Sequence, residues 1–145
     1  MINHMKDIYM MDKQAWREFF ARFRDEVNDS FDILDFDDMS ELWDFLAEGN
    51  KSGVYIIRNN YNTKIFVGSS LSLEAQIRKY LKEDGTPTDE APVKLRRDYR
   101  YHKNTRKCDD FRLGVAVVIL EEELHKVSKN IFIKAYGAKK WGYNS

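Results

Sequence analysis

A run of positive side chains between residues 94 and 107 is the clearest candidate for chemistry in this sequence, namely the binding of phosphate groups. Seven lysines and arginines stand there against one acid, Asp98. Phosphate contacts made by such cations supply most of the sequence-independent affinity of proteins for nucleic acids. The segment therefore favours a nucleic acid as a partner, contacted by Lys94, Arg96, Arg97, Arg100 and Lys103.

The spacing of these cations agrees with an exposed helix face. In a helix over residues 92–103, four of the cations fall on one side, and the opposite side, which suits the core, carries Leu95, Tyr99 and His102. Charge runs of this kind also occur on surfaces that only keep a protein soluble. The alternative is therefore a solvated face, or a face that pairs with acidic residues of the same chain.

Acidic residues dominate the stretch between Asn28 and Asn50, which contains eight carboxylates and no lysine or arginine. Apolar side chains interleaved with them favour docking against a surface: Phe31, Ile33, Leu34 and Phe36. The carboxylates could cover the basic segment in cis, or present phosphate-like spacing to the DNA-binding surface of another protein. The candidate partner-binding residues are Asp35, Asp37 and Asp38. The plainest alternative is a solvated helix surface.

Length and charge distribution suggest one domain with a small accessory element. A chain of 145 residues is long enough for a core without disulfides. Its formal net charge of zero hides a segregation: residues 1–50 carry 13 acids and 5 bases, a balance of −8, and residues 51–145 carry a balance of +8. We therefore expect an acidic helical extension over residues 1–50 and a separate domain over residues 51–145.

Cysteine usage and hydropathy favour a soluble protein of a reducing compartment. The single cysteine, Cys108, excludes an internal disulfide and a thiolate zinc cluster, and we expect it to be reduced. The chain opens without a charged-then-apolar leader, and the longest apolar run, at residues 115–120, is far shorter than the roughly 20 residues of a membrane span. We expect a cytoplasmic protein that contacts no membrane.

Helical periodicity is expected in the first 50 residues. Asp12 is a suitable N-cap for a helix with an apolar stripe of 3.6-residue period, made of Trp16, Phe19, Phe20, Phe23 and Val27. A second helix is expected from Ser40 to Gly49, which can adopt the left-handed conformation that ends helices. Its expected inward side chains are Leu42, Phe45 and Leu46. These two helices form the predicted extension.

The apolar period changes to two at Gly53. The segments GVYIIR (53–58) and KIFVG (64–68) predict two strands, and NNYNT between them predicts a hairpin connection. A helix capped by Ser72 is expected to follow, buried through Leu73, Ile77, Tyr80 and Leu81.

Three further elements are expected between residues 92 and 137. Pro92 suits the first turn of the helix that carries the cations. The run FRLGVAVVIL (111–120) predicts a third strand buried on both faces. A closing helix that ends at Gly137 is expected to turn inward Leu124, Val127, Ile131 and Ala135. The sequence thus predicts an α+β fold with a three-stranded antiparallel sheet flanked by helices and an N-terminal helical extension.

Two motifs within the predicted strands resemble the signature of the GIY-YIG endonucleases, and in particular of the phage-type homing endonucleases of that family. They are Gly53-Val54-Tyr55 and Phe66-Val67-Gly68, followed by SSLSLEAQIRKYL. The likeness continues through KLRRDYRYHKN (94–104), FRLGVAVVILEE (111–122) and KNIFIKAYGAKKWGYN (129–144), and so covers residues 51–144. Order, spacing and the terminal GYN together carry the resemblance.

The resemblance implies a site for metal-dependent hydrolysis of a phosphodiester that has lost chemical groups. In that family a glutamate binds one divalent ion, an arginine stabilises the phosphate, and tyrosines position water. Here Tyr55 keeps the first tyrosine, but the second is Phe66. The arginine position holds Gln76, a neutral amide, and the glutamate position holds Lys129, an ammonium. We therefore expect no catalysis and no bound metal.

Two further positions keep the family pattern and complete the expected remnant of the site. His102 matches a histidine of the second helix, and Asn144 matches the closing asparagine. Each has a plain structural interpretation beside it: Tyr55 as a packed strand aromatic, and His102 as a hydrogen-bonded, half-buried ring. The six remnant positions are Tyr55, Phe66, Gln76, His102, Lys129 and Asn144.

Three functions remain open at this point. The leading hypothesis is a catalytically inactive GIY-YIG-fold protein that binds nucleic acid through helix 92–103 and is modulated by its acidic extension. A second is an inhibitor or interaction protein, phage-encoded as the resemblance implies, whose extension engages a host nuclease or defence factor. The third is an active endonuclease with relocated groups, the only one of the three that would need a cofactor, Mg²⁺.

Overall fold

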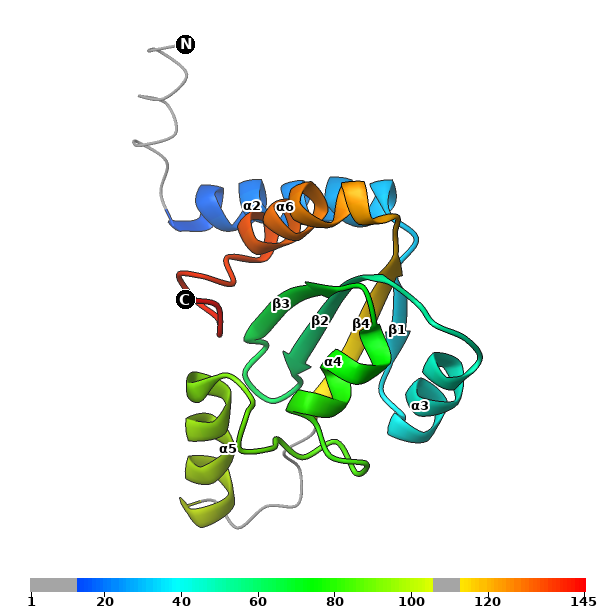
Figure 1. Cartoon of the computed structure of the whole chain (residues 1–145). Coiled ribbons are helices and arrows are strands. Elements are labelled where there is room, and N and C mark those ends of the chain that lie inside the picture. The colour runs from blue at the N-terminus through cyan, green and yellow to red at the C-terminus, as the bar shows by residue number, and fades with distance from the viewer. Residues whose placement is uncertain (1–12, 106–112) are drawn as a thin grey trace.

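A four-stranded antiparallel sheet forms the centre of the molecule (Figure 1). The computed structural model describes residues 13–105 and 113–145. The strands are β1 (Leu34–Phe36), β2 (Gly53–Asn59), β3 (Ile65–Ser70) and β4 (Leu113–Ile119), in the order β1-β4-β2-β3. Helices lie against both faces of this sheet (Figure 1), so the predicted α+β class is confirmed.

The prediction of three strands is wrong by one, because β1 lies inside the acidic stretch of the chain. It pairs antiparallel with β4, with Leu34 opposite Val117. A strand of three residues flanked by carboxylates is too short to show the period of two that marks the longer strands. Residues 13–50 therefore form a helix, a strand and a helix, and not the predicted helical pair. The domain boundary at residue 50 stays a prediction.

The helices divide between the two faces of the sheet (Figure 1). On one face, α2 (Lys13–Ser30) and α6 (His125–Tyr136) lie side by side, and α6 follows a short 3-10 turn, Glu122–Leu124. On the other face lie α3 (Met39–Ala47) and α4 (Leu73–Tyr80). The fifth described helix, α5 (Val93–Thr105), covers the end of the sheet where β2 and β3 are joined.

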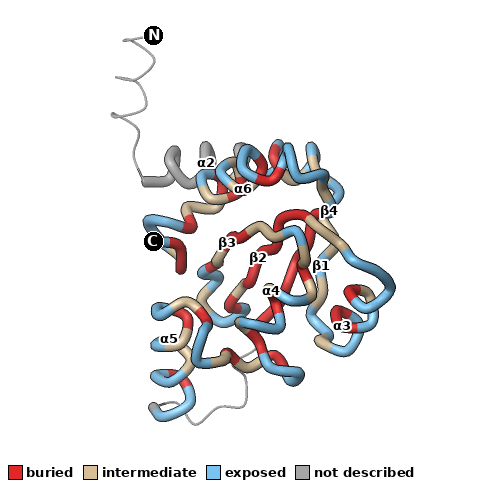
Figure 2. The backbone as a smooth tube through the Cα atoms, viewed as in Figure 1, coloured by how far each residue is buried: buried red, intermediate tan, exposed pale blue. Residues whose placement is uncertain are grey.

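Alternation along the strands builds two cores, one on each face. Along β2, Tyr55 and Ile57 face α3 and α4, whereas Val54 and Ile56 face α6. All residues of β4 from Leu113 to Val118 are buried, which confirms the prediction of a strand covered on both sides. In Figure 2 the buried residues accordingly lie along the central strands.

Local capping signals account for several helix ends. Ser72 caps α4 as predicted, since its Oγ accepts a hydrogen bond of 3.4 Å from the backbone N–H of Ala75. Gly137 ends α6 with φ of 61°, also as predicted. The helix α3 begins at Met39, one residue before the predicted start, and is capped by Asp38, whereas Gly49 is not left-handed.

The inward face of α6 agrees with the predicted one at Ala135, which is buried, and differs from it at Leu124 and Val127. Leu124 and Val127 are 49% and 60% exposed, and the buried side chains are His125, Ser128, Phe132 and Ala135. Two polar residues therefore occupy positions that the hydrophobic pattern assigned to solvent. His125 is accommodated because its Nε2 lies 3.0 Å from the carbonyl oxygen of Leu120.

Some predictions fall on residues that the structure does not describe. Asp12, Cys108 and the side chains of Trp16, Phe19, Phe20 and Phe23 lie outside the described part, whereas Val27 is buried as expected. Trp43, which was not predicted to face inward, is buried in α3, and Phe45 is half-buried. Within the described residues, no helix has the length and apolarity needed to cross a membrane.

Candidate functional site

The Tyr55 ring is buried at the centre of β2 because the neighbouring strand leaves room for it. Tyr55 is only 2% exposed and pairs with Gly68 of β3. A Cβ built on Gly68 would lie 2.3 Å from Cζ of Tyr55. The glycine of the second motif is therefore a steric requirement of the tyrosine of the first.

Three of the remnant positions come together around the Tyr55 hydroxyl. Gln76, on α4, donates a hydrogen bond of 3.3 Å from its Nε2 to the Tyr55 oxygen. The rings of Tyr55 and Phe66 are 6.1 Å apart, and Tyr80 closes the group with its ring 5.7 Å from that of Phe66. Burial raises the pKa of Tyr55, and the Gln76 hydrogen bond partly opposes that rise.

The chemistry available in this cluster is limited. Two hydroxyls, an amide and a phenyl ring supply no carboxylate to hold a divalent ion and no guanidinium to hold a phosphate. Tyr80 was predicted only as a core residue, and its ring at i+4 from Gln76 on α4 is the signal that places it here. Among the described residues, no group of three or more acidic, histidine or cysteine side chains could hold a metal. These residues therefore do not fit the metal that the resemblance implies.

The other three remnant positions lie apart from this cluster. Lys129 is half-buried on α6, against the opposite face of the sheet, and makes no ion pair within the described residues. Asn144 clamps β3, because its amide exchanges two hydrogen bonds of 2.8 Å with the backbone of Val67. His102 is buried on α5, and its ring lies 4.7 Å from that of Tyr61 in the β2–β3 loop.

The cations of α5 are presented much as the sequence predicts. Leu95 and His102 are buried and Tyr99 is half-buried, so this side of the helix faces the protein. The exposed cations are Lys94, Arg97, Arg100 and Lys103. Arg96 is less available, since its Nε donates a hydrogen bond of 2.8 Å to the carbonyl of Ala91.

A hydrogen-bond network that sequence reasoning missed fixes α5 to the end of the sheet. The Tyr143 hydroxyl donates to Asp98 of α5 at 2.8 Å and accepts from Asn59 Nδ2 at 3.1 Å. Asn62, in the β2–β3 loop, also donates to Asp98, and Lys64 lies 3.9 Å from the same carboxylate. The single acid of the basic segment is thus engaged by the protein itself.

The three candidate partner-binding acids have contacts within the chain. Asp38 accepts a hydrogen bond of 2.8 Å from the backbone N–H of Ser40 and so caps α3. Asp35 and Asp37 form ion pairs of 3.3 and 3.1 Å with Arg58 of β2, yet their side chains remain 50% and 75% exposed. Their role in binding a partner stays a prediction.

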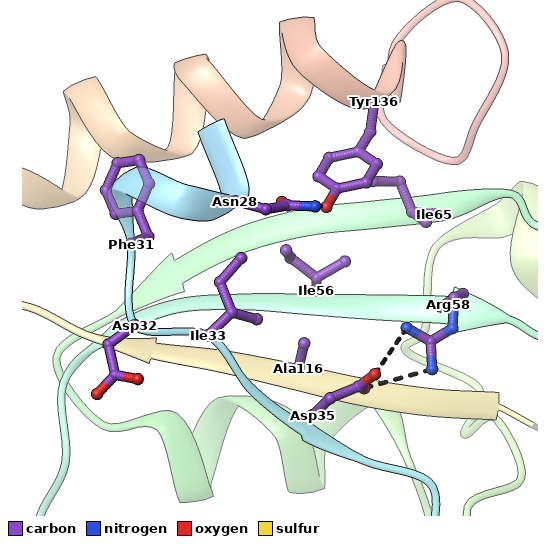
Figure 3. Close-up of a pocket in the computed structure, with 10 residues that line it drawn as sticks. All are labelled: Asn28, Phe31, Asp32, Ile33, Asp35, Ile56, Arg58, Ile65, Ala116 and Tyr136. Carbon is purple, nitrogen blue, oxygen red and sulfur yellow. Dashed lines mark hydrogen bonds and ion pairs between the residues drawn. The ribbon is translucent and has the colours of Figure 1, made fainter. Parts of the chain in front are cut away.

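Asp35 and Arg58 also border a cleft of about 440 Å³ between the sheet and the ends of α2 and α6 (Figure 3). Its apolar surface comes mainly from Ile33, Ile56, Ile65 and Ala116. Figure 3 shows the Arg58 guanidinium pointing to the Asp35 carboxylate across one side of this cleft. The cation at its border is thus already neutralised by acids of the same chain.

Comparison with known proteins supports the resemblance seen in the sequence. The chain is 31% identical over 94 residues to intron-associated endonuclease 1 of Enterobacteria phage T4, a match that covers 65% of the chain. It spans only 36% of that relative's length. By this match the chain is similar to an endonuclease over about two thirds of its own residues. No family model matches the chain.

Two solved structures are similar over the same share of the chain. The catalytic domain of the homing endonuclease I-TevI is 28% identical with a TM-score of 0.47, and the match covers 64% of this chain and 96% of that one. A mutant of the catalytic domain of intron endonuclease I-TevI is 27% identical with a TM-score of 0.46, covering 65% and 92%.

Proposed function

We propose that this protein is a catalytically inactive GIY-YIG-fold protein that binds nucleic acid through α5. The observation that carries the proposal is the set of exposed cations on that helix. None of the ion pairs found among the described residues involves Lys94, Arg97, Arg100 or Lys103. The one nearby acid, Asp98, is held by Tyr143 and Lys64. Arg100 donates a hydrogen bond of 3.5 Å to the carbonyl of Arg96, and Lys103 lies 5.8 Å from the centre of the Tyr99 ring. Neither contact neutralises a charge, so these cations are available to phosphates.

The absence of catalysis is inferred from residue types. The cluster around Tyr55 carries an amide, Gln76, where phosphate stabilisation needs a cation, and Phe66 lacks a hydroxyl. Lys129 lies on the opposite face of the sheet and offers no carboxylate oxygen to a metal ion. The homologous relative is called an endonuclease. In this chain we infer that the frame of that domain is kept and the hydrolytic groups are lost.

The acidic residues of the first 50 positions modulate this binding in the proposal. Their balance of −8 and the balance of +8 in the rest of the chain attract each other and compete with phosphates for the cations. Asp35 and Asp37 give a local example, because they already neutralise Arg58. This competition should weaken as salt screens exposed charges over a Debye length of about 8 Å near physiological ionic strength.

The test is a titration of a DNA duplex with the full chain at several salt concentrations. We expect the logarithm of the affinity to fall linearly with the logarithm of salt concentration, and Arg97→Ala with Arg100→Ala to reduce the slope by roughly 0.9 for each lost phosphate contact. Lys126→Ala with Lys134→Ala on α6 removes the same charge from exposed positions and serves as the matched control. Equal slopes for the two double variants would remove α5 from the proposal.

A further inference from the structure

Three exposed aromatic side chains are carried by segments that are hydrogen-bonded to one another at the end of the sheet that α5 covers. Eight large apolar side chains are exposed among the described residues, and three of them are aromatic: Tyr61, Tyr101 and Trp141, at 49%, 61% and 69% exposure. They come from three segments, the β2–β3 loop, α5 and the chain after α6. An exposed aromatic ring lacks the burial that usually stabilises it, and exposed apolar groups close together often mark a binding site.

The hydrogen-bond network around Asp98 holds these three segments together. Tyr143, two residues after Trp141, donates to Asp98 at 2.8 Å, and Asn62, next to Tyr61, donates to the same carboxylate at 3.1 Å. Tyr101 lies three residues after Asp98 on α5, which is nearly one turn. Figure 1 shows α5, the β2–β3 loop and the C-terminal segment at this one end of the molecule. We call Tyr61, Tyr101 and Trp141 the aromatic end.

Positive charge accompanies the aromatic end. On α5, Lys94 and Arg97 lie on the same flank as Tyr101 by helix geometry, and both are exposed. Lys139 and Lys140 are exposed beside Trp141, and the Nζ of Lys140 lies 5.1 Å from the centre of its ring. Cations next to exposed rings form the combination that single-stranded nucleic acids require, because phosphates meet the cations and unpaired bases stack on the rings.

We propose that the aromatic end binds nucleic acid that has unpaired bases, with bases stacked on Tyr101 and Trp141. This inference rests on the proposed function and names the form of its ligand. In a duplex the faces of the bases are covered by their neighbours, so exposed rings add nothing to phosphate contacts. Single strands, loops and ends offer free base faces. The form with unpaired bases should therefore bind more tightly than a duplex of equal charge.

The experiment compares oligonucleotides of roughly 16 residues, the upper end of the usual site size of one single-strand-binding module. Fluorescence anisotropy of oligo(dT), oligo(U) and a DNA duplex measures the affinity of the full chain. We expect Tyr101→Ala and Trp141→Ala each to lower single-strand affinity at least about fivefold, the factor for roughly 1 kcal/mol of stacking, with duplex affinity unchanged. The DNA and RNA strands distinguish the two sources of unpaired bases.

Conservative variants separate stacking from structural effects. Tyr101→Phe and Trp141→Phe keep a ring and should retain most of the affinity. Trp141 lies close to Gly137 at the end of α6, so its removal could loosen that end, whereas Tyr101 is 61% exposed and has no such contact. Val127→Ala on α6, at a residue 60% exposed, is the control for loss of an exposed apolar side chain.

Each outcome decides the question. If Tyr101→Ala leaves single-strand affinity unchanged, bases do not stack on the aromatic end and this inference is wrong. If Arg97→Ala with Arg100→Ala still lowers the salt slope in that case, the proposed function stands. Equal losses for Tyr101→Ala and Tyr101→Phe also exclude stacking. Wild-type protein that binds neither strands nor duplex at low salt overturns both proposals.

Discussion

Gly68 lies opposite Tyr55 in the β2–β3 pair, and a side chain of even one carbon at Gly68 would meet the Tyr55 ring at 2.3 Å. The two motif residues therefore depend on each other for packing, whatever chemistry the tyrosine performs. This dependence gives a packing reason to keep both motifs in a chain that has Gln76 and Lys129 where the resemblance places catalytic groups. The presence of the two motifs therefore indicates how the sheet is packed, and it does not indicate whether catalytic groups are present.

Gly68→Ala should destabilise the protein, because the new methyl group overlaps the buried Tyr55 ring. Overpacking of this kind costs typically about 1–3 kcal/mol, which urea unfolding followed by circular dichroism would measure. Gly49→Ala is the matched control, since a Cβ there meets nothing within 4 Å. A Gly68→Ala variant as stable as the control would show that the ring moves aside at no cost.

Tyr143→Phe should weaken the attachment of α5 and lower the free energy of unfolding by roughly 1–3 kcal/mol, since Asn59 is left with a buried amide that has lost its acceptor. Tyr101→Phe removes a hydroxyl from an exposed ring and should change stability by less than about 0.5 kcal/mol. Denaturant midpoints of the two variants provide the comparison. Equal midpoints would mean that the network around Asp98 contributes nothing to stability.

Ionisation of the Tyr143 hydroxyl should lower the free energy of unfolding at alkaline pH. Burial raises the pKa of Tyr143 to about 12, above its usual value of 10.0. The folded state thus favours the neutral phenol, and this contribution is complete below about pH 10 and is lost as pH rises toward 12. We expect the unfolding free energy of wild type to fall over that range more steeply than that of Tyr143→Phe. Parallel pH curves for the two proteins would contradict the assignment.

Local signals made much of the fold predictable from sequence. Ser72 caps the start of α4 through its side chain, and Gly137 ends α6 through its backbone conformation, so three or four neighbouring residues contain the information. The long apolar run of β4 predicts burial on both faces for the same reason. The short strand β1 was missed because its pairing with β4 joins residues about 80 positions apart.

The parts of the candidate site that depend on local spacing or on adjacent elements were predictable from the sequence. The exposed face of α5 follows from helical spacing, and the cluster of Tyr55, Phe66 and Gln76 follows from two paired strands and the helix after them. The Asp98–Tyr143 hydrogen bond joins residues 45 positions apart, and no periodic pattern in the sequence predicts it. Burial of Ser128 on α6 was missed since a hydrophobic pattern places polar residues in solvent.

Plasmid DNA incubated with the protein and Mg²⁺ or Mn²⁺ should not be nicked above background. The cluster around Tyr55 lacks a phosphate cation and a metal ligand, and these two groups carry most of the stabilisation of phosphoryl chemistry. Gln76→Arg with Lys129→Glu restores both residue types, but Lys129 lies on α6 against the face of the sheet opposite Tyr55, so the double variant is also expected to stay at background. Metal-dependent nicking by the wild type that disappears in Tyr55→Phe would overturn the inactive assignment.

The acidic residues should restrain DNA binding mainly through charge, and two pairs of substitutions test this. Asp35→Asn with Asp37→Asn removes two charges and also releases Arg58, whereas Asp44→Asn with Glu48→Gln removes two exposed charges that make no ion pair in the described residues. Exposed ion pairs are worth at most about 1 kcal/mol, so neither variant should unfold.

Both variants should bind duplex DNA more tightly at low salt, because each reduces the competition for the cations of α5. The gain should disappear toward 1 M salt, where the Debye length is about 3 Å. A larger gain for the Asp35 and Asp37 variant would identify the released Arg58 as an additional contact. Asp38→Asn leaves an equally good N-cap on α3 and can be added to either variant without loss of the helix. Duplex affinity that is the same in wild type and in both variants would show that the acidic residues are only solvated and do not modulate binding.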